Sequence, residues 1–337
     1  MIQYQSEGLF DLQVNGYAAV DFNDPAITAE KVDKALYAML QDGVTGCLPT
    51  LITASLADLK ERFNALDNAV TKSELGAKMV PGYHLEGPFL NKESGYIGCH
   101  PKEETCDPDP EIIKHLEKDL NRPILLVTLA PELKGSIATI KTLRETGKVI
   151  AIGHSAAGYD TVQAAVDAGI SLSTHLGNGL PSILPKLENT LLAQLGESQL
   201  SGCFIADGHH ISPQALKNMI KIKGVEKSIL VTDAVVAARS EPGSYTFAGL
   251  KIERGQDGIV RSPGQINLAG SSLCLKEAVK NLVNWNISTF EQATRMASTN
   301  ARNAIKRALD YHNIILNPDR ITWNEDLFLD QGKPIQT

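Results

Sequence analysis

The sequence predicts an α/β protein built as a (β/α)8 barrel of the TIM type, with a reduced small β-domain or β-ribbon insertion. Short apolar runs alternate with amphipathic helical stretches along most of the 337 residues,. Eight such runs occur, and most end in polar residues, as the strands of this barrel class do at their functional face. The length suits one barrel of about 250 residues with additions.

The elements follow one another as strand and then helix. Thr28 is the expected N-cap of a helix over residues 28–40, and Gly169 ends a helix over residues 159–168,. Further helices are expected over residues 55–73, 271–285 and 289–309,. The eight predicted strands, each an apolar run suited to a buried parallel sheet, cover residues 8–14, 44–51, 79–85, 124–129, 149–152, 170–174, 202–206 and 228–232,.

Residues 237–267 depart from this alternation of strand and helix. Their glycines and alternating apolar positions, as in Tyr245-Thr246-Phe247, predict a β-ribbon inserted after the eighth strand,. The closing tail holds one candidate strand, at residues 321–323. We therefore expect a barrel formed by residues 8–236 and 268–310, and a small β decoration formed by residues 237–267 and 317–337.

Composition limits the possible partners. The net charge of −7 provides no basic stripe for a nucleic acid, although a small anion needs only a local cluster of donors,. The chain starts without a basic segment followed by an apolar core, and no apolar run approaches about 18 residues,. We expect no membrane association and a cytoplasmic location. The five cysteines form no C-x-x-C pair and are expected to be reduced,.

Two histidines follow neighbouring predicted strands. His154 comes after the strand at 149–152, and His175 comes after the strand at 170–174. Parallel strands lie about 4.8 Å apart, so the two imidazoles can reach one ion. Glu86, at the end of the third strand, would complete a His2Glu ligand set with an open coordination position. The alternatives are two unrelated polar histidines and a helix-capping or salt-bridged surface glutamate.

Asp233 ends the eighth apolar strand, where an unpaired carboxylate is costly to bury,. Beside a metal site it can take the proton of an attacking water and return it to a leaving group. A buried structural aspartate is the alternative. His100 lies in a glycine-rich loop and can polarise a substrate carbonyl, or it is a loop histidine without such a role.

Other polar residues give weaker support for a functional site at the same end of the barrel. Asn178 and Gly179 suit an oxyanion or phosphate, or form an ordinary turn. His210 and Lys186 can supply positive charge, although most lysines are simply solvated. Gln13 and Asn15 end the first strand, and residues 268–272 form a tight loop before a helix, where free N–H groups can line a pocket,.

The chain resembles the N-acetylglucosamine-6-phosphate deacetylases, members of the amidohydrolase superfamily. The resemblance covers nearly the whole chain, from DLQVNG to the helix after Gly270. The matching motifs, in the order and spacing of that family, are HLEGPF, GCHP, TLAPE, GHSAAGYD, THLGNGLP, IADGHH, LVTDA and LAGSSL.

The resemblance implies roles for individual residues. It implies metal ligation by Glu86, His154 and His175, acid and base catalysis by Asp233, and contact with the substrate carbonyl through His100. The substrate contacts that we expect are Gln13, Cys99, Asn178, Gly179, Lys186, His210, Leu268, Ala269 and Gly270.

The sequence also departs from the family. Gln13-Val14-Asn15 stands where some relatives carry His-x-His and a second metal, so we expect one divalent ion. Zinc is favoured, while Fe2+, Co2+ and Mn2+ accept similar ligands. Lys186 replaces a phosphate-binding arginine, and Asn178-Gly179-Leu180 replaces Asn-Ala-Met,. This chain starts almost at the first barrel strand and its closing segment lacks the family's glycine-punctuated strands, so we expect a reduced small β-domain.

The expected activity is removal of the acetyl group from N-acetylglucosamine 6-phosphate, which gives glucosamine 6-phosphate and acetate. One alternative is deacylation of a different N-acyl amino sugar or amine without phosphate. The other is a barrel that binds sugar phosphates without turnover. The family is typically dimeric, so a homodimer is expected.

Overall fold

The computed structural model describes residues 4–264 and 267–324. Its centre is a parallel eight-stranded sheet in the order β11-β10-β9-β8-β7-β6-β5-β2, which confirms the predicted barrel. The strands are β2 (Leu9–Val14), β5 (Val44–Ile52), β6 (Tyr83–Glu86), β7 (Ile124–Leu129), β8 (Val149–Ile152), β9 (Leu172–Ser173), β10 (Ser201–Phe204) and β11 (Ser228–Leu230).

Several of these strands are shorter than predicted. The run at 79–85 begins as a strand only at Tyr83, because Met79 belongs to the short helix α3 (Gly76–Met79). β9 and β11 end at Ser173 and Leu230, and the backbone enters the left-handed region shortly after each of them, at His175 and Asp233,.

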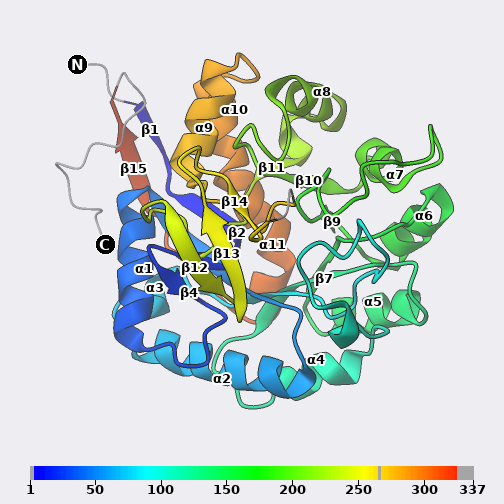
Figure 1. Cartoon of the computed structure of the whole chain (residues 1–337), viewed down its shortest axis with the longest axis horizontal. Coiled ribbons are helices and arrows are strands. Elements are labelled where there is room, and N and C mark those ends of the chain that lie inside the picture. Colours follow the sequence, from blue (N-terminus) through cyan, green and yellow to red (C-terminus); the bar gives the residue numbers. More distant parts are fainter. Residues whose placement is uncertain (1–3, 265–266, 325–337) are drawn as a thin grey trace.

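Helices surround the sheet (Figure 1). Thr28 caps the first one, as predicted, by accepting a hydrogen bond from the Lys31 N–H. None of the described helices is both long and apolar enough to cross a bilayer. In addition to α3, the described helices are α1 (Ala29–Gln41), α2 (Leu56–Lys72), α4 (Pro110–Glu117), α5 (Ser136–Glu145), α6 (Tyr159–Ala168), α7 (Thr190–Gly196), α8 (Pro213–Lys223), α9 (Leu275–Asn284), α10 (Phe290–Met296) and α11 (Thr299–Tyr311). Two 3-10 turns, η1 (Lys102–Glu104) and η2 (Val225–Lys227), are also present.

The predicted helix over residues 289–309 is two helices, α10 and α11. The break falls at Ala297 and Ser298, where the Ser298 hydroxyl donates to the Thr294 carbonyl at 2.6 Å. The break also leaves the Ala297 carbonyl free to accept a hydrogen bond from the Phe10 N–H at 2.9 Å. A serine that competes for backbone groups therefore interrupts the helix and ties it to strand β2.

Small antiparallel sheets lie outside the barrel. β12 (Gly243–Phe247), β13 (Leu250–Arg254) and β14 (Val260–Arg261) form the predicted ribbon, which lies in front of the barrel in Figure 1. It packs on the barrel through a separate apolar cluster: Ile52, Val235, Val236, Ala237, Phe247, Ile252, Val260 and Ala269.

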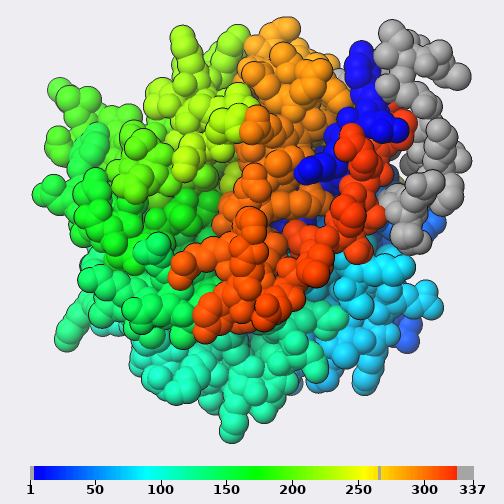
Figure 2. Space-filling view, turned by 180° about the vertical axis from the view of Figure 1, so that it is seen from behind, coloured from blue at the N-terminus to red at the C-terminus, as the bar shows by residue number. Residues whose placement is uncertain are grey.

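The two ends of the described chain also pair. β1 (Tyr4–Glu7) and β15 (Arg320–Trp323) form an antiparallel pair, and Figure 2 shows these blue and red segments side by side. The pairing includes the candidate strand at 321–323, whereas β1 and the pair β3 (Gly16–Tyr17) and β4 (Val20–Asp21) were not predicted. The division into barrel and β decoration stays a prediction, and residues 265–266 and 325–337 of the predicted β decoration lie outside the described residues.

The barrel closes between β2 and β11 through few contacts. Beyond the end of β11, the Asp233 N–H donates to the Gln13 carbonyl at 2.9 Å, and the Asn15 N–H donates to the Ala234 carbonyl at 2.7 Å. Deeper in the barrel, the Thr232 hydroxyl donates to the fully buried Asp11 carboxylate at 2.5 Å. Burial raises the pKa of Asp11 to about 7, although hydrogen bonds from Thr232 and Gln13 oppose the shift.

We predict that Thr232→Val weakens this closure. The change keeps the shape of the side chain but leaves a buried carboxylate oxygen of Asp11 without its hydroxyl donor. The free energy of unfolding should fall by about 1–3 kcal/mol in urea denaturation at pH 8. The control is Thr142→Val, which removes an exposed helical hydroxyl and should change stability by less than about 0.5 kcal/mol,. Equal effects of the two changes would contradict the role of Thr232.

Candidate active site

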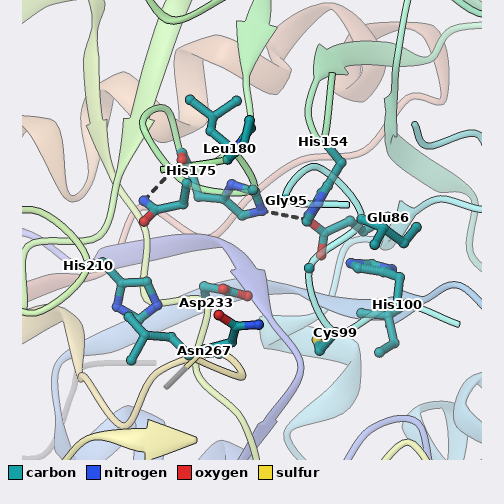
Figure 3. Close-up of a pocket in the computed structure, with 18 of the residues that line it drawn as sticks. Glu86, Gly95, Cys99, His100, His154, His175, Leu180, His210, Asp233 and Asn267 are labelled. Carbon is teal, nitrogen blue, oxygen red and sulfur yellow. Dashed lines mark hydrogen bonds and ion pairs between the residues drawn. The ribbon is translucent and has the colours of Figure 1, made fainter. Parts of the chain in front are cut away.

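Glu86, His154 and His175 meet at the carboxyl ends of β6, β8 and β9. One ligand atom of each lies within 4.8 Å of the others, and all three residues are buried. Both Nε2 atoms approach the same oxygen, Glu86 Oε1, His175 at 2.8 Å and His154 at 3.4 Å. Figure 3 shows these side chains pointing toward one another at one side of the cavity. The structure therefore brings the three predicted ligands together.

The backbone at this site is strained. His154, His175 and Asp233 have φ values of 50°, 28° and 49°, in the left-handed region that side chains with a Cβ seldom adopt,. Each follows the end of a barrel strand. Such conformations concentrate at functional sites, where the surrounding structure holds them.

The ring of His154 is fixed from three sides. Its Nδ1 lies 2.5 Å from the Tyr96 carbonyl, which can only accept, so this nitrogen carries the proton and Nε2 is free to bind a cation,. A Cβ at Gly98 would lie 3.2 Å from the ring, and one at Gly179 would lie 2.8 Å from it. Gly179, predicted to contact substrate, therefore also provides room for a predicted ligand.

The donor set fits a divalent cation of the zinc type. It consists of two imidazoles and a carboxylate, with the cavity on the remaining side,. Burial alone raises the pKa of Glu86, but the neighbouring imidazoles of His154 and His175 outweigh it and hold that pKa well below the usual range. The carboxylate is thus anionic, as a ligand must be.

Asp233 lies between this cluster and His210 (Figure 3). Its Oδ1 accepts hydrogen bonds from the side-chain amides of Asn15 at 2.8 Å and Gln13 at 3.2 Å. The same Gln13 amide also donates to Glu86 Oε2 at 3.1 Å. Burial and the charge of Glu86 raise the pKa of Asp233.

His100 stands beside the cluster with its ring edge against His154, at 4.6 Å between centroids. The Thr53 hydroxyl lies 2.9 Å from its Nδ1. Burial lowers the pKa of His100 to about 3, so the ring is neutral at pH 7. The Thr53 hydroxyl also lies 3.4 Å from the Glu86 carbonyl, so its one proton goes either to that oxygen or to His100 Nδ1. When Thr53 donates to Nδ1, the neutral ring carries its proton on Nε2, and Nε2 is then a hydrogen-bond donor.

A cavity of about 570 Å3 opens above these groups. Among the residues predicted to contact substrate, Cys99, Asn178, Gly179, His210, Leu268 and Gly270 line it together with His100 and Asp233. Three others do not. Gln13 lies behind the wall and bonds to Glu86 and Asp233, Ala269 is buried under the ribbon, and Lys186 is exposed in the loop that follows β9.

Other lining residues were not predicted as substrate contacts. They include Asn15, Ser94, Phe247 and Asn267. Asn15 was recognisable as a polar residue at the end of the first strand, whereas Phe247 reaches the cavity only because the ribbon folds over the barrel mouth. Within the described part of the chain, the lining contains no lysine or arginine.

Comparisons with known proteins agree with this geometry. No protein-family model matches the chain. It is 31% identical over 288 residues to the N-acetylgalactosamine-6-phosphate deacetylase of Escherichia coli O157:H7, covering 86% of this chain and 74% of the relative. It is 29% identical over 303 residues to the N-acetylglucosamine-6-phosphate deacetylase of Lysinibacillus sphaericus, covering 89% and 76%.

A solved structure matches nearly the whole fold. The N-acetyl-D-glucosamine-6-phosphate deacetylase of Mycobacterium smegmatis, a mutant in complex with N-acetyl-D-glucosamine-6-phosphate, superposes with a TM-score of 0.86 at 27% identity. The match covers 97% of this chain and 84% of the other. The chain therefore belongs to the family of N-acetylglucosamine-6-phosphate and N-acetylgalactosamine-6-phosphate deacetylases, within the amidohydrolase superfamily, as its motifs indicated.

Proposed function

We propose that this enzyme hydrolyses the N-acetyl amide of N-acetylglucosamine 6-phosphate and releases glucosamine 6-phosphate and acetate. The convergence of Glu86, His154 and His175 beside Asp233 on one cavity carries the proposal. Relatives named for the glucosamine and the galactosamine substrates match at similar identity. N-acetylgalactosamine 6-phosphate should therefore be tested as a second substrate in the same acetate-release assay.

We infer that the three ligands hold one divalent cation, with zinc favoured by two imidazoles and a carboxylate,. A cation held there would polarise the amide carbonyl and make water more acidic. The side-chain amides of Gln13 and Asn15 bond to Glu86 and Asp233, in the stretch where some relatives carry second-metal histidines. This arrangement supports a single-metal site.

Asp233 is the proposed acid and base. Its carboxylate takes a proton from the attacking water as the water oxygen bonds to the acyl carbon. When the C–N bond breaks, Asp233 returns that proton to the departing nitrogen, so the amine leaves neutral. The raised pKa of Asp233 brings it nearer neutrality, which suits a group that both accepts and donates,. His100, as a neutral donor, hydrogen-bonds the amide oxygen.

The sugar and its anion would contact the remaining lining residues. Asn178 and Gly179 offer an amide and a backbone N–H, and His210 is held by Asp207 through an Nδ1 to Oδ2 contact of 2.6 Å. Cys99, Leu268 and Gly270 complete the wall. Gln13 acts from behind the wall by holding the two carboxylates.

A second candidate is deacetylation of an amino sugar without phosphate. The absence of lysine and arginine from the described cavity lining favours it, because phosphate sites commonly use these residues,. Lys186 reaches the anion only if its exposed loop moves toward the cavity or meets another subunit.

We further propose a homodimer. Ile183 and Leu187 are 87% and 69% exposed, and they flank Lys186 beside the cavity-lining residues Leu180 and Pro181. The Tyr159 hydroxyl donates to the Leu187 carbonyl and adds a partly exposed ring. Exposed apolar side chains gathered in this way are typical of interaction surfaces. The cytoplasmic location expected from the sequence stays a prediction.

The role of Asp233 is tested by comparing Asp233→Asn with His175→Ala. Both should reduce the kcat for acetate release from N-acetylglucosamine 6-phosphate, Asp233→Asn by about 100-fold or more because the proton carrier is lost. Elemental analysis should find about one equivalent of metal in the wild type and in Asp233→Asn, and much less in His175→Ala. A normal kcat in Asp233→Asn would refute the role of this carboxylate.

The anion contact is tested with Lys186→Ala. If Lys186 binds phosphate, KM should rise several-fold for the phosphorylated sugar and stay unchanged for N-acetylglucosamine, with kcat little altered for either. Lys34→Ala, which removes an exposed lysine from α1, is the control. An equal kcat/KM for both sugars in the wild type would instead favour the second candidate.

The dimer is tested with Ile183→Asp and Leu187→Asp combined. The wild type should show twice the chain mass in light scattering, and the double variant should show the mass of one chain because charges are placed on the apolar surface. Ile315→Asp, at a 95% exposed position, is the matched control and should remain a dimer. A monomeric wild type at micromolar concentration would contradict the proposal.

A further inference from the structure

Glu132, in the TLAPE motif after β7, has no role in the proposed reaction, yet both of its carboxylate oxygens accept hydrogen bonds. Oε2 accepts from the Ser155 hydroxyl at 2.7 Å, and Oε1 accepts from the Ala156 N–H at 2.6 Å. Oε1 also accepts from the side-chain amide of Asn91 at 2.9 Å. Glu132 thus joins the loop after β6 to the two residues that follow His154.

The loop after β6 returns to His154 by two routes. The Asn91 N–H donates to the His154 carbonyl at 3.1 Å. The Asn91 side-chain oxygen accepts from the Glu93 N–H at 2.9 Å, and the Glu93 carbonyl accepts from the Tyr96 N–H at 3.1 Å. The Tyr96 carbonyl then meets His154 Nδ1 at 2.5 Å. A hydrogen-bond network therefore connects Glu132 to both the backbone and the ring of His154.

We propose that Glu132 is a positioning residue that keeps His154 in the geometry required of a metal ligand. The proposal rests on the proposed function, because it assumes that His154 binds the cation. The left-handed backbone at His154 is a conformation that the chain does not favour, so neighbouring contacts must hold it,. Glu132 binds the residues directly after this strained position, and through Asn91 it orders the loop that orients the ring. Groups that hydrogen-bond a ligating histidine strongly affect metal affinity. Glu132 acts on such a group, the Tyr96 carbonyl, through Asn91 and Glu93.

The test measures binding of Co2+ alone, by chelator competition and by its visible absorption spectrum. Glu132→Ala should weaken Co2+ binding by about 10- to 100-fold and shift the spectrum, because His154 is no longer held. Glu132→Gln keeps one acceptor oxygen and most of the shape, and it should recover most of the affinity. Asn91→Ala removes both the amide donor to Glu132 and the acceptor of the Glu93 N–H, but it leaves the bonds of Glu132 to Ser155 and Ala156 in place. It should give an intermediate loss of affinity, and it tests the proposal if Glu132→Ala does not fold.

Asp33→Ala is the matched control. Asp33 likewise accepts from a serine hydroxyl, Ser73, and from two backbone N–H groups, but it lies on α1. It should lose stability in urea and keep the Co2+ affinity and spectrum of the wild type. Wild-type Co2+ affinity and spectrum in folded Glu132→Ala, or in Asn91→Ala where Glu132→Ala does not fold, would overturn the proposal. Failure of the wild type to bind Co2+ would instead overturn the proposed metal function.

Discussion

The closure of the barrel between β2 and β11 is the constraint on which the site depends. The seven other neighbouring strand pairs are joined by hydrogen-bonded ladders. The pair β2 and β11 is instead held by hydrogen bonds between Asp11 and Thr232 and between the backbones of residues 13–15 and 233–234. The closure places the first strand beside the eighth, and only then can Gln13 and Asn15 reach Asp233. A flat sheet with the same strands would hold Asp233 far from Glu86.

Through this closure, two carboxylates of the same chemical kind acquire opposite properties. Two imidazoles hold the pKa of Glu86 down, whereas burial and the charge of Glu86 hold the pKa of Asp233 up. The Gln13 amide donates to both carboxylates and so links them without adding a charge. Environments that separate two acids in this way assign one to ligation and the other to proton transfer.

Much of this arrangement could be predicted from the sequence, because polar residues after apolar parallel strands must meet at one edge. Such a pattern indicates which strand ends carry chemistry, but it does not show how deep a side chain lies. Both Gln13 and Asn15 hold the Asp233 carboxylate, but only Asn15 also lines the cavity, whereas the deeper Gln13 reaches Glu86 instead. Ala269 points under the ribbon while its neighbours Leu268 and Gly270 face the cavity. The course of the Lys186 loop depends on contacts such as the Asn189 side chain on the Pro185 carbonyl, which no periodicity reveals.

The left-handed backbone at the strand tips also bears on how this protein can be improved. His154, His175 and Asp233 hold backbone conformations that glycine would adopt more easily, so the residues proposed for catalysis and metal binding lower the stability of the folded state,. Selection for heat tolerance alone would therefore favour chains that relax these three positions. A laboratory search for hardier variants should preserve them deliberately, since the most robust barrel and the working catalyst are different optima.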